Sequence, residues 1–114
     1  MIDKNGNLTI IKGGTLDDLV TYYEPDGVTP VNLTGMGAIT RIKENHKSDN
    51  VIILSTANGG MILGGTAGTV RWFMDKEDTA NITINEGIFD TFLINNDIEE
   101  PFLFKKNFYA AERV

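Results

Sequence analysis

The chain has 114 residues, no cysteine and a formal net charge of −6 at pH 7. This length fits one domain over residues 1–114, and the lack of cysteine excludes disulfides, thiol nucleophiles and cysteine-bound zinc. The acidic balance argues against a nucleic-acid partner, and no apolar run approaches the roughly 20 residues that span a bilayer, so we expect a soluble protein without a membrane partner.

The first half of the chain alternates strand-forming runs with turn residues. We expect strands at Leu8–Ile11, Leu16–Tyr23 and Ala38–Lys43, and a short extended piece at Val31–Thr34. Residues 24–27 read Glu-Pro-Asp-Gly. This is a turn sequence, because Pro fixes φ at the second position and Asp-Gly tolerates positive φ. A polar loop follows the third strand.

The glycine-rich stretch STANGGMILGGTAGTVRW, residues 55–72, raises the question of a phosphate-binding loop. Gly68 is followed by Thr69 and Val70 rather than by the Lys-Ser/Thr pair that such a loop needs. The residues that follow favour a strand instead. Asn58-Gly59 is a strong hairpin dipeptide, and it predicts a tight type I′ hairpin between strands at Val51–Thr56 and Met61–Leu63.

The last third predicts one short helix and a final hairpin. Asp75–Asn81 is rich in charge and favours one or two helical turns. Strands are expected at Ile88–Ile94 and Phe102–Tyr109, joined by the acidic segment Asn95–Pro101. Short strands at regular spacing are typical of a β-sandwich. We therefore predict an all-β, Ig-like antiparallel β-sandwich of about seven or eight short strands with little helix.

No residue pattern predicts an active site, a cofactor or a metal centre, and we expect no enzyme activity. His46 is the only histidine and lies in a polar loop, so zinc would lack protein ligands. Ser48 or Ser55 could join His46 in a triad, but no nucleophile elbow is present. The carboxylate pairs of the chain lie on a strand, where neighbours point to opposite faces, or in turns, where they are solvated.

Several segments follow one another in an order that is typical of one known family. They are Ile11–Thr15, Gly27–Gly35, Ala38–Lys43, Leu54–Val70, Asp78–Ala80 and Gly87–Asp90. The most specific parts are PVNLTG at Pro30–Gly35 and NGG at Asn58–Gly60. In this order the chain, over residues 10–94, resembles small tail-associated structural proteins of tailed bacteriophages and prophages. It is also similar to the N-terminal Ig-like module of some baseplate upper proteins.

The resemblance implies a non-enzymatic virion protein of the tail, fiber or baseplate, assembled in the cytoplasm of a bacterial host. Its partners would be other phage tail proteins, through homo-oligomers or docking. The chain departs from the family pattern at Phe89–Leu93, so no assembly contact is transferred. The alternative function is a module that binds carbohydrate or a host surface, for which Tyr22 and Tyr23 could form a sugar platform.

The last strand is the candidate interface. Side chains alternate between the two faces of a strand, so Phe102, Phe104 and Phe108 are expected on one face and Leu103, Lys105 and Tyr109 on the other. Both faces then carry more apolar groups than one core needs, and an open sandwich leaves edge strands that can pair. In the alternative, the Tyr109 face covers a sheet edge under the N-terminal segment.

Overall fold

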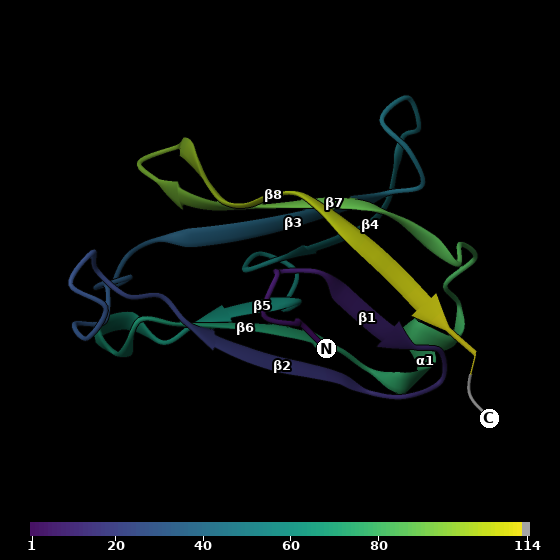
Figure 1. The fold of residues 1–114 in the computed structure, drawn as a ribbon, viewed down its shortest axis with the longest axis horizontal. Helices are drawn as coiled ribbons and strands as arrows, with labels where there is room; N and C mark the ends of the chain where they lie inside the picture. The colour runs from purple at the N-terminus through teal and green to yellow at the C-terminus, as the bar shows by residue number, and fades with distance from the viewer. Residues whose placement is uncertain (113–114) are drawn as a thin grey trace.

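Two β-sheets stack face to face around one hydrophobic core in the computed structural model (Figure 1). The structure describes residues 1–112, apart from the side chains of Asn50, Val51 and Phe104. Within these residues the strands are β1 (Leu8–Ile11), β2 (Leu16–Thr21), β3 (Gly37–Lys43), β4 (Asn50–Ser55), β5 (Met61–Leu63), β6 (Thr69–Met74), β7 (Glu86–Asn95) and β8 (Ile98–Ala111). Helical structure there comprises the 3-10 turn η1 (Gly65–Ala67) and the helix α1 (Lys76–Ala80).

The larger sheet has the strand order β1-β8-β7-β3-β4, and the smaller sheet has the order β2-β6-β5. Neighbouring strands are antiparallel, except that β1 runs parallel to β8. The two layers confirm the predicted all-β sandwich with little helix. Two strands are longer than expected, since β7 has 10 residues and β8 has 14.

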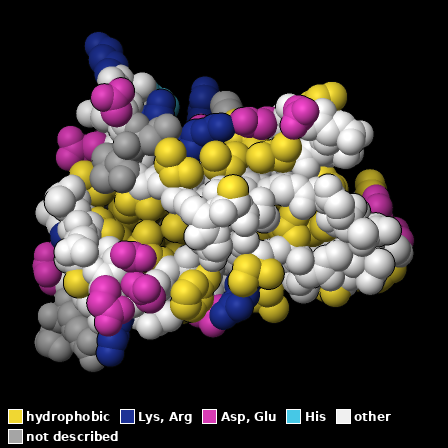
Figure 2. Space-filling model, turned by 180° about the vertical axis from the view of Figure 1, so that it is seen from behind, with side chains coloured by type: hydrophobic (Ala, Val, Ile, Leu, Met, Phe, Trp, Pro, Cys, Tyr) yellow, Lys and Arg dark blue, Asp and Glu magenta, His cyan; other side chains and the backbone are white. Residues whose placement is uncertain are grey.

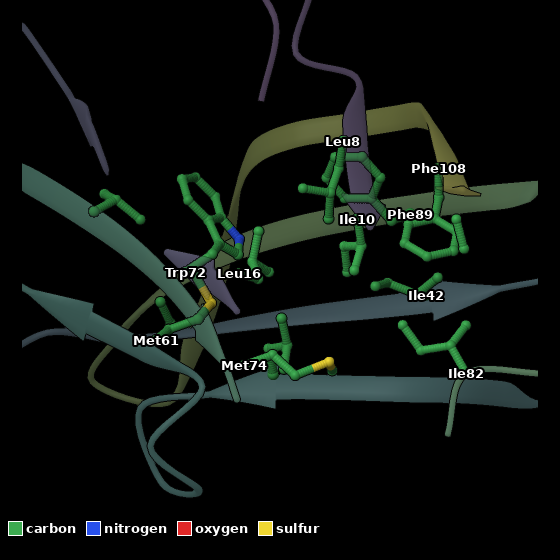
Figure 3. Packing of buried hydrophobic residues seen from close by; sticks show 14 of the residues in the cluster. Leu8, Ile10, Leu16, Ile42, Met61, Trp72, Met74, Ile82, Phe89 and Phe108 are labelled. Carbon is green, nitrogen blue, oxygen red and sulfur yellow. The ribbon is translucent and has the colours of Figure 1, made fainter. Parts of the chain in front are cut away.

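The core lies between the sheets and is built by the alternation of side chains along each strand. In β6, Val70 and Trp72 are fully buried, and their sequence neighbours face outward. Phe89 of β7 and Phe108 of β8 lie side by side in the same core (Figure 3). The expected core role of the strand aromatics is thus confirmed for Trp72, Phe89 and Phe108, whereas Phe92 is half-buried outside this cluster.

Buried hydroxyl groups satisfy the one polar group of the central tryptophan. The indole Nε1 of Trp72 donates a hydrogen bond of 2.9 Å to Oγ1 of Thr40. Oγ1 of Thr40 also lies 2.7 Å from Oγ1 of Thr91. All three side chains are fully buried, so these bonds offset the desolvation of their polar atoms and fix β3, β6 and β7 relative to one another.

The predicted short helix is confirmed as α1, and its sequence explains where it starts. Asp75 is the N-cap residue, and its side chain accepts a hydrogen bond of 2.9 Å from the Asp78 N–H. The buried Thr79 connects this helix to the turn after β1. Its Oγ1 donates to the C=O of Gly14 at 2.7 Å and accepts from the N–H of Gly13 at 3.0 Å.

The predicted hairpin at Asn58-Gly59 is wrong, although the turn itself is present. β4 pairs with β3 in the larger sheet, and β5 pairs with β6 in the smaller one. The turn therefore carries the chain from one layer to the other. Gly59 does adopt a positive φ of 82°, so the dipeptide indicates a reversal of the chain correctly but not the partner of each strand.

The tight hairpin of this protein lies between β7 and β8 instead. Asn95 pairs with Ile98, which leaves Asn96 and Asp97 as a two-residue loop. Both loop residues have positive φ, 51° and 66°, as a type I′ turn requires. The predicted connection Asn95–Pro101 was too long, because most of it belongs to β8.

Candidate interaction surface

The six candidate interface residues of β8 do not form the two faces that alternation predicts. Phe108 is fully buried in the core, and Phe102 and Leu103, which are adjacent in sequence, both pack against that core. Lys105 and Tyr109 are exposed. The side chain of Phe104 lies outside the described part of the structure.

Two irregularities in the pairing of β8 with β7 explain the difference. The register shifts between Phe89 and Thr91 and again between Thr91 and Phe92. Lys105 has a positive φ of 53° at the first shift, which is typical of a β-bulge. Each bulge inserts an extra residue and reverses the alternation beyond it. The face assignment of the candidate interface is therefore wrong, and Phe108 is a core residue.

β1 is the neighbouring strand of β8 on one side, but only at the C-terminal end of β8. Among the described residues, no strand pairs with β8 on that side before residue 107. β1 pairs only with Phe108–Ala111. Pro101 lies in this open part and has no N–H to offer to another strand. Glu99 and Glu100 add charge next to it. A proline, bulges and charges are the features that protect an edge strand from pairing, so this edge is a poor site for strand addition.

A side chain covers one end of the edge of β4. Oδ1 of Asn58 accepts the N–H of Ser55 at 2.9 Å, and Nδ2 of Asn58 donates to the C=O of Ile53 at 2.8 Å. One carboxamide thus supplies the donor and the acceptor that a neighbouring strand would bring. In the sequence, Asn58-Gly59 predicts a hairpin turn, and no signal there indicates this role of the asparagine.

The edge of β1 is closed by the N-terminal residues, which fold back beside it. The N–H of Thr9 donates to the C=O of Met1 at 2.8 Å, and the N-terminal ammonium group donates to the C=O of Thr9. The C=O of Ile11 accepts from the N–H of Gly14 at 3.0 Å. Parts of both edges of the larger sheet are therefore covered, and β8 is blunted where it is open.

β2, in contrast, presents an open edge. The N–H of Tyr22 donates to the C=O of Gly68 at 2.7 Å, which identifies Tyr22 and Gly68 as a hydrogen-bonded pair. Because the direction of the backbone groups alternates along a strand, every second residue of β2, counted back from Tyr22, directs its N–H and C=O toward β6. The residues between them, Asp17, Leu19 and Thr21, direct these groups away from the sheet. β5 forms the other edge of this sheet and is only three residues long.

Exposed apolar side chains gather around β2. Leu19 retains 62% of its surface, and Ile62 retains 46%. Both lie opposite Arg71 in the pairing, so Leu19, Arg71 and Ile62 form one row across the outer face of the smaller sheet. Tyr23 and Val28 are also exposed, in the loop that follows β2. We call Leu19, Ile62, Tyr23 and Val28, together with the open edge of β2, the β2 surface.

Two ion pairs neutralise the acidic residues of β2. Arg71 binds Asp17 through two hydrogen bonds, Nε to Oδ1 at 2.7 Å and Nη2 to Oδ2 at 2.8 Å. These bonds from Arg71 lower the pKa of the Asp17 carboxyl from its ordinary value. Asp18 lies 3.3 Å from the N-terminal ammonium group and also accepts the N–H of Ile2. The strand therefore carries little net charge despite its two carboxylates.

The opposite side of the sandwich has a groove between β4 and the end of β6. It has a volume of about 530 Å³, and it is lined in part by Leu54, Phe73 and Met74. Asp75 and Asp78 form its rim. Figure 2 shows the apolar side chains in this hollow and the acidic side chains at its lower left. Asp75 caps α1, so one of the two rim carboxylates already has a structural role.

The residues considered for catalysis have structural partners or are solvated. Oγ of Ser48 accepts the N–H of Asn45 at 2.9 Å, and Oγ of Ser55 accepts the N–H of Asn58 at 3.2 Å. His46 is exposed in the loop between β3 and β4. Among residues 1–112, the structure brings together no group of three or more His, Asp or Glu side chains that could hold a metal ion.

The two tyrosines that were considered as a sugar platform differ in their surroundings. The ring of Tyr22 lies 4.9 Å from that of Phe102, at an angle of 59°. Tyr23 forms an isolated bridge with Pro30 and is about half exposed. Tyr22 thus helps to cover the core beside Phe102.

The described part of the chain has no helix long and apolar enough to cross a membrane.

Comparisons with known proteins give a likeness to solved structures. No protein-family model and no curated protein sequence matches the chain. Among solved structures, the chain is similar to the extracellular domain of the voltage-gated sodium channel β4 subunit, described in parallel homodimer structures that explain its role in cell–cell adhesion. The sequence identity is 10%, the TM-score is 0.41, and the match covers 95% of this chain and 92% of the other. A likeness at this level defines neither the function nor the partner of the chain.

Proposed function

We propose that this protein is a non-enzymatic structural component of a larger protein assembly and that it acts by binding other proteins through the β2 surface. The setting implied by the sequence resemblance is a phage virion, at the tail, fiber or baseplate. The observation that carries the proposal is the contrast between edges. Asn58 and Met1 bind outward-facing backbone groups of β4 and β1, whereas no described segment binds those of Leu19 in the middle of β2, whose side chain is also exposed.

This contrast supports binding because an open edge has a cost in a free monomer. An unpaired edge strand with an apolar side chain is prone to unspecific association, and proteins usually protect it. The chain protects its other long edges with side chains, a proline or its own N-terminus. An edge that stays open beside exposed apolar residues is therefore a natural place for a partner.

The test is binding to the proteins encoded next to this chain, with purified wild-type protein and two variants. Leu19→Lys places a charge in the centre of the β2 surface. Ile98→Lys is the matched control, because Ile98 is 64% exposed and lies at the β7–β8 hairpin of the other sheet. We expect the wild type and Ile98→Lys to bind at least one protein chain, either a neighbouring tail protein or a second copy of this one, and Leu19→Lys to lose that binding. Equal binding of all three would contradict the proposal.

A further inference from the structure

We propose that the partner at the β2 surface is a second copy of this chain, whose β2 pairs antiparallel with the first across a two-fold axis at Leu19. This inference rests on the proposed function, because it names the partner of the same open edge. The pairing would join the two three-stranded sheets, each ordered β2-β6-β5, into one continuous sheet.

The outward-facing N–H and C=O groups of β2 can pair with those of β2 in a second copy in this register. Asp17, Leu19 and Thr21 direct their N–H and C=O groups outward, as the pairing with β6 requires. In an antiparallel pair about Leu19, that residue faces Leu19 of the copy, and Asp17 faces Thr21. Outward-directed residues then face each other at three positions, and each such pair exchanges N–H···O bonds.

Charge favours this register over the one with its axis at Asp18. When the two-fold axis lies at Leu19, Asp17 lies opposite Thr21 of the copy and Asp18 lies opposite Val20 of the copy. A shift of the axis to Asp18 would instead place Asp18 against Asp18, and like charges directly opposite each other destabilise a sheet. The remaining charges are compensated within each copy, because Arg71 holds Asp17 and the N-terminal ammonium group holds Asp18.

Grooves with apolar lining flank both halves of β2. The groove beside the first half has a volume of about 470 Å³ and is lined in part by the exposed side chains of Met1 and Ile11. The groove beside the second half has a volume of about 450 Å³ and is lined in part by Val20, Phe102 and Leu103. An antiparallel two-fold arrangement brings the first half of one strand against the second half of the other, so apolar surface of each copy meets apolar surface of its partner.

The first test is sedimentation of the wild type, Leu19→Pro and Ile98→Lys over a range of micromolar concentrations. Proline at position 19 removes an N–H that points away from β6, so it spares the bonds within the protomer. We expect a wild-type dimer, and a dissociation constant raised about tenfold or more in Leu19→Pro, because a bond from each copy is lost. Ile98→Lys should dimerise like the wild type. Circular dichroism checks the fold of Leu19→Pro, and Leu19→Lys replaces it if it does not fold.

The second test measures the register by crosslinking. The chain has no cysteine, so Leu19→Cys and Thr21→Cys each introduce a single thiol. Directly opposed residues of a hydrogen-bonded pair have Cα atoms about 5.5 Å apart, within the range of a disulfide. Leu19→Cys should therefore form a disulfide-linked dimer on mild oxidation. Thr21→Cys should not, because Thr21 faces Asp17 of the copy. Equal crosslinking of both variants would overturn the register.

The outcomes separate this inference from the proposed function. A wild type that stays monomeric at every concentration overturns the pairing of two copies. If that monomer still binds a neighbouring tail protein and Leu19→Pro does not, the β2 surface has a foreign partner and the proposed function stands. If the wild type neither dimerises nor binds, both proposals fail. A dimer that Leu19→Pro leaves unchanged uses another surface and also overturns the inference.

Discussion

The carboxamide of Asn58 binds the backbone of Ser55 as a neighbouring strand would. Its Oδ1 accepts the Ser55 N–H at 2.9 Å, and its Nδ2 donates to the C=O of Ile53 at 2.8 Å. The same oxygen accepts the N–H of Gly60 at 2.9 Å. One side chain thus covers the end of the β4 edge and also shapes the turn that leads to the other sheet.

Replacing Asn58 by alanine should therefore weaken the fold. The Ser55 N–H is partly buried and loses its partner, so we expect a loss of about 1–2 kcal/mol in the free energy of unfolding. Chemical denaturation measures this loss. Asn95→Ala is the control, because Asn95 is exposed at the end of β7 and its change should have little effect. An Asn58→Ala variant as stable as the control would contradict the role of the carboxamide.

Gly59→Val should destabilise the protein by more than about 1 kcal/mol, because a β-branched residue resists positive φ. Gly59 has a φ of 82°, and a Cβ added there would meet no atom within 4 Å. The penalty is therefore one of backbone conformation and not of crowding. Gly59→Asn should cost less, since asparagine tolerates this region. Thermal unfolding compares the two variants, and equal midpoints for both would show that the backbone conformation is not the cause.

The acidic titration of Asp17 should depend on Arg71. The hydrogen bonds from Arg71 lower the pKa of Asp17 in the folded protein, so the ion pair stabilises the fold above the unfolded pKa. That contribution is lost as the pH falls through the lowered pKa of the folded state. An NMR titration of the Asp17 carboxyl should show a lower midpoint in the wild type than in Arg71→Gln. The same midpoint in both proteins would rule out this coupling.

Thr40→Val should be among the more destabilising conservative changes in the core. It leaves the Trp72 N–H and the Thr91 hydroxyl without their partner, at an expected cost of about 1–3 kcal/mol per buried donor. Thr91→Val is the comparison, because it removes the bond to Thr40 and leaves the tryptophan paired. Urea denaturation should rank Thr40→Val as the less stable variant, and the reverse order would contradict the account of the buried hydroxyl groups.

The sequence predicts those features of this fold that depend on local chemistry. The β-branched and aromatic strand at β6 and the short helix within Asp75–Asn81 are both found where expected, because the propensities of neighbouring residues act within a few positions. Strand pairing is not local. Asn58-Gly59 has the chemistry of a hairpin turn, but whether β4 and β5 pair depends on the sheets that β3 and β6 build.

The assignment of the candidate interface residues to two faces of β8 was wrong for a related reason. Alternation along β8 assumes an unbroken register, and the bulge at Lys105 is set by the pairing with β7 and not by a residue type that marks it. The open edge of β2 could not be found in the sequence either. It depends on which backbone groups β6 occupies, and that is fixed only when Tyr22 pairs with Gly68.

Hydrogen–deuterium exchange at single amides tests the central claim most directly, namely that β2 binds through its open edge. The amides of Asp18 and Val20 pair with β6 and should exchange slowly at every concentration. The amide of Leu19 should exchange quickly in dilute protein and become protected in concentrated protein, or when a binding partner is added. An amide of Leu19 that exchanges at the unprotected rate under all of these conditions would contradict the account.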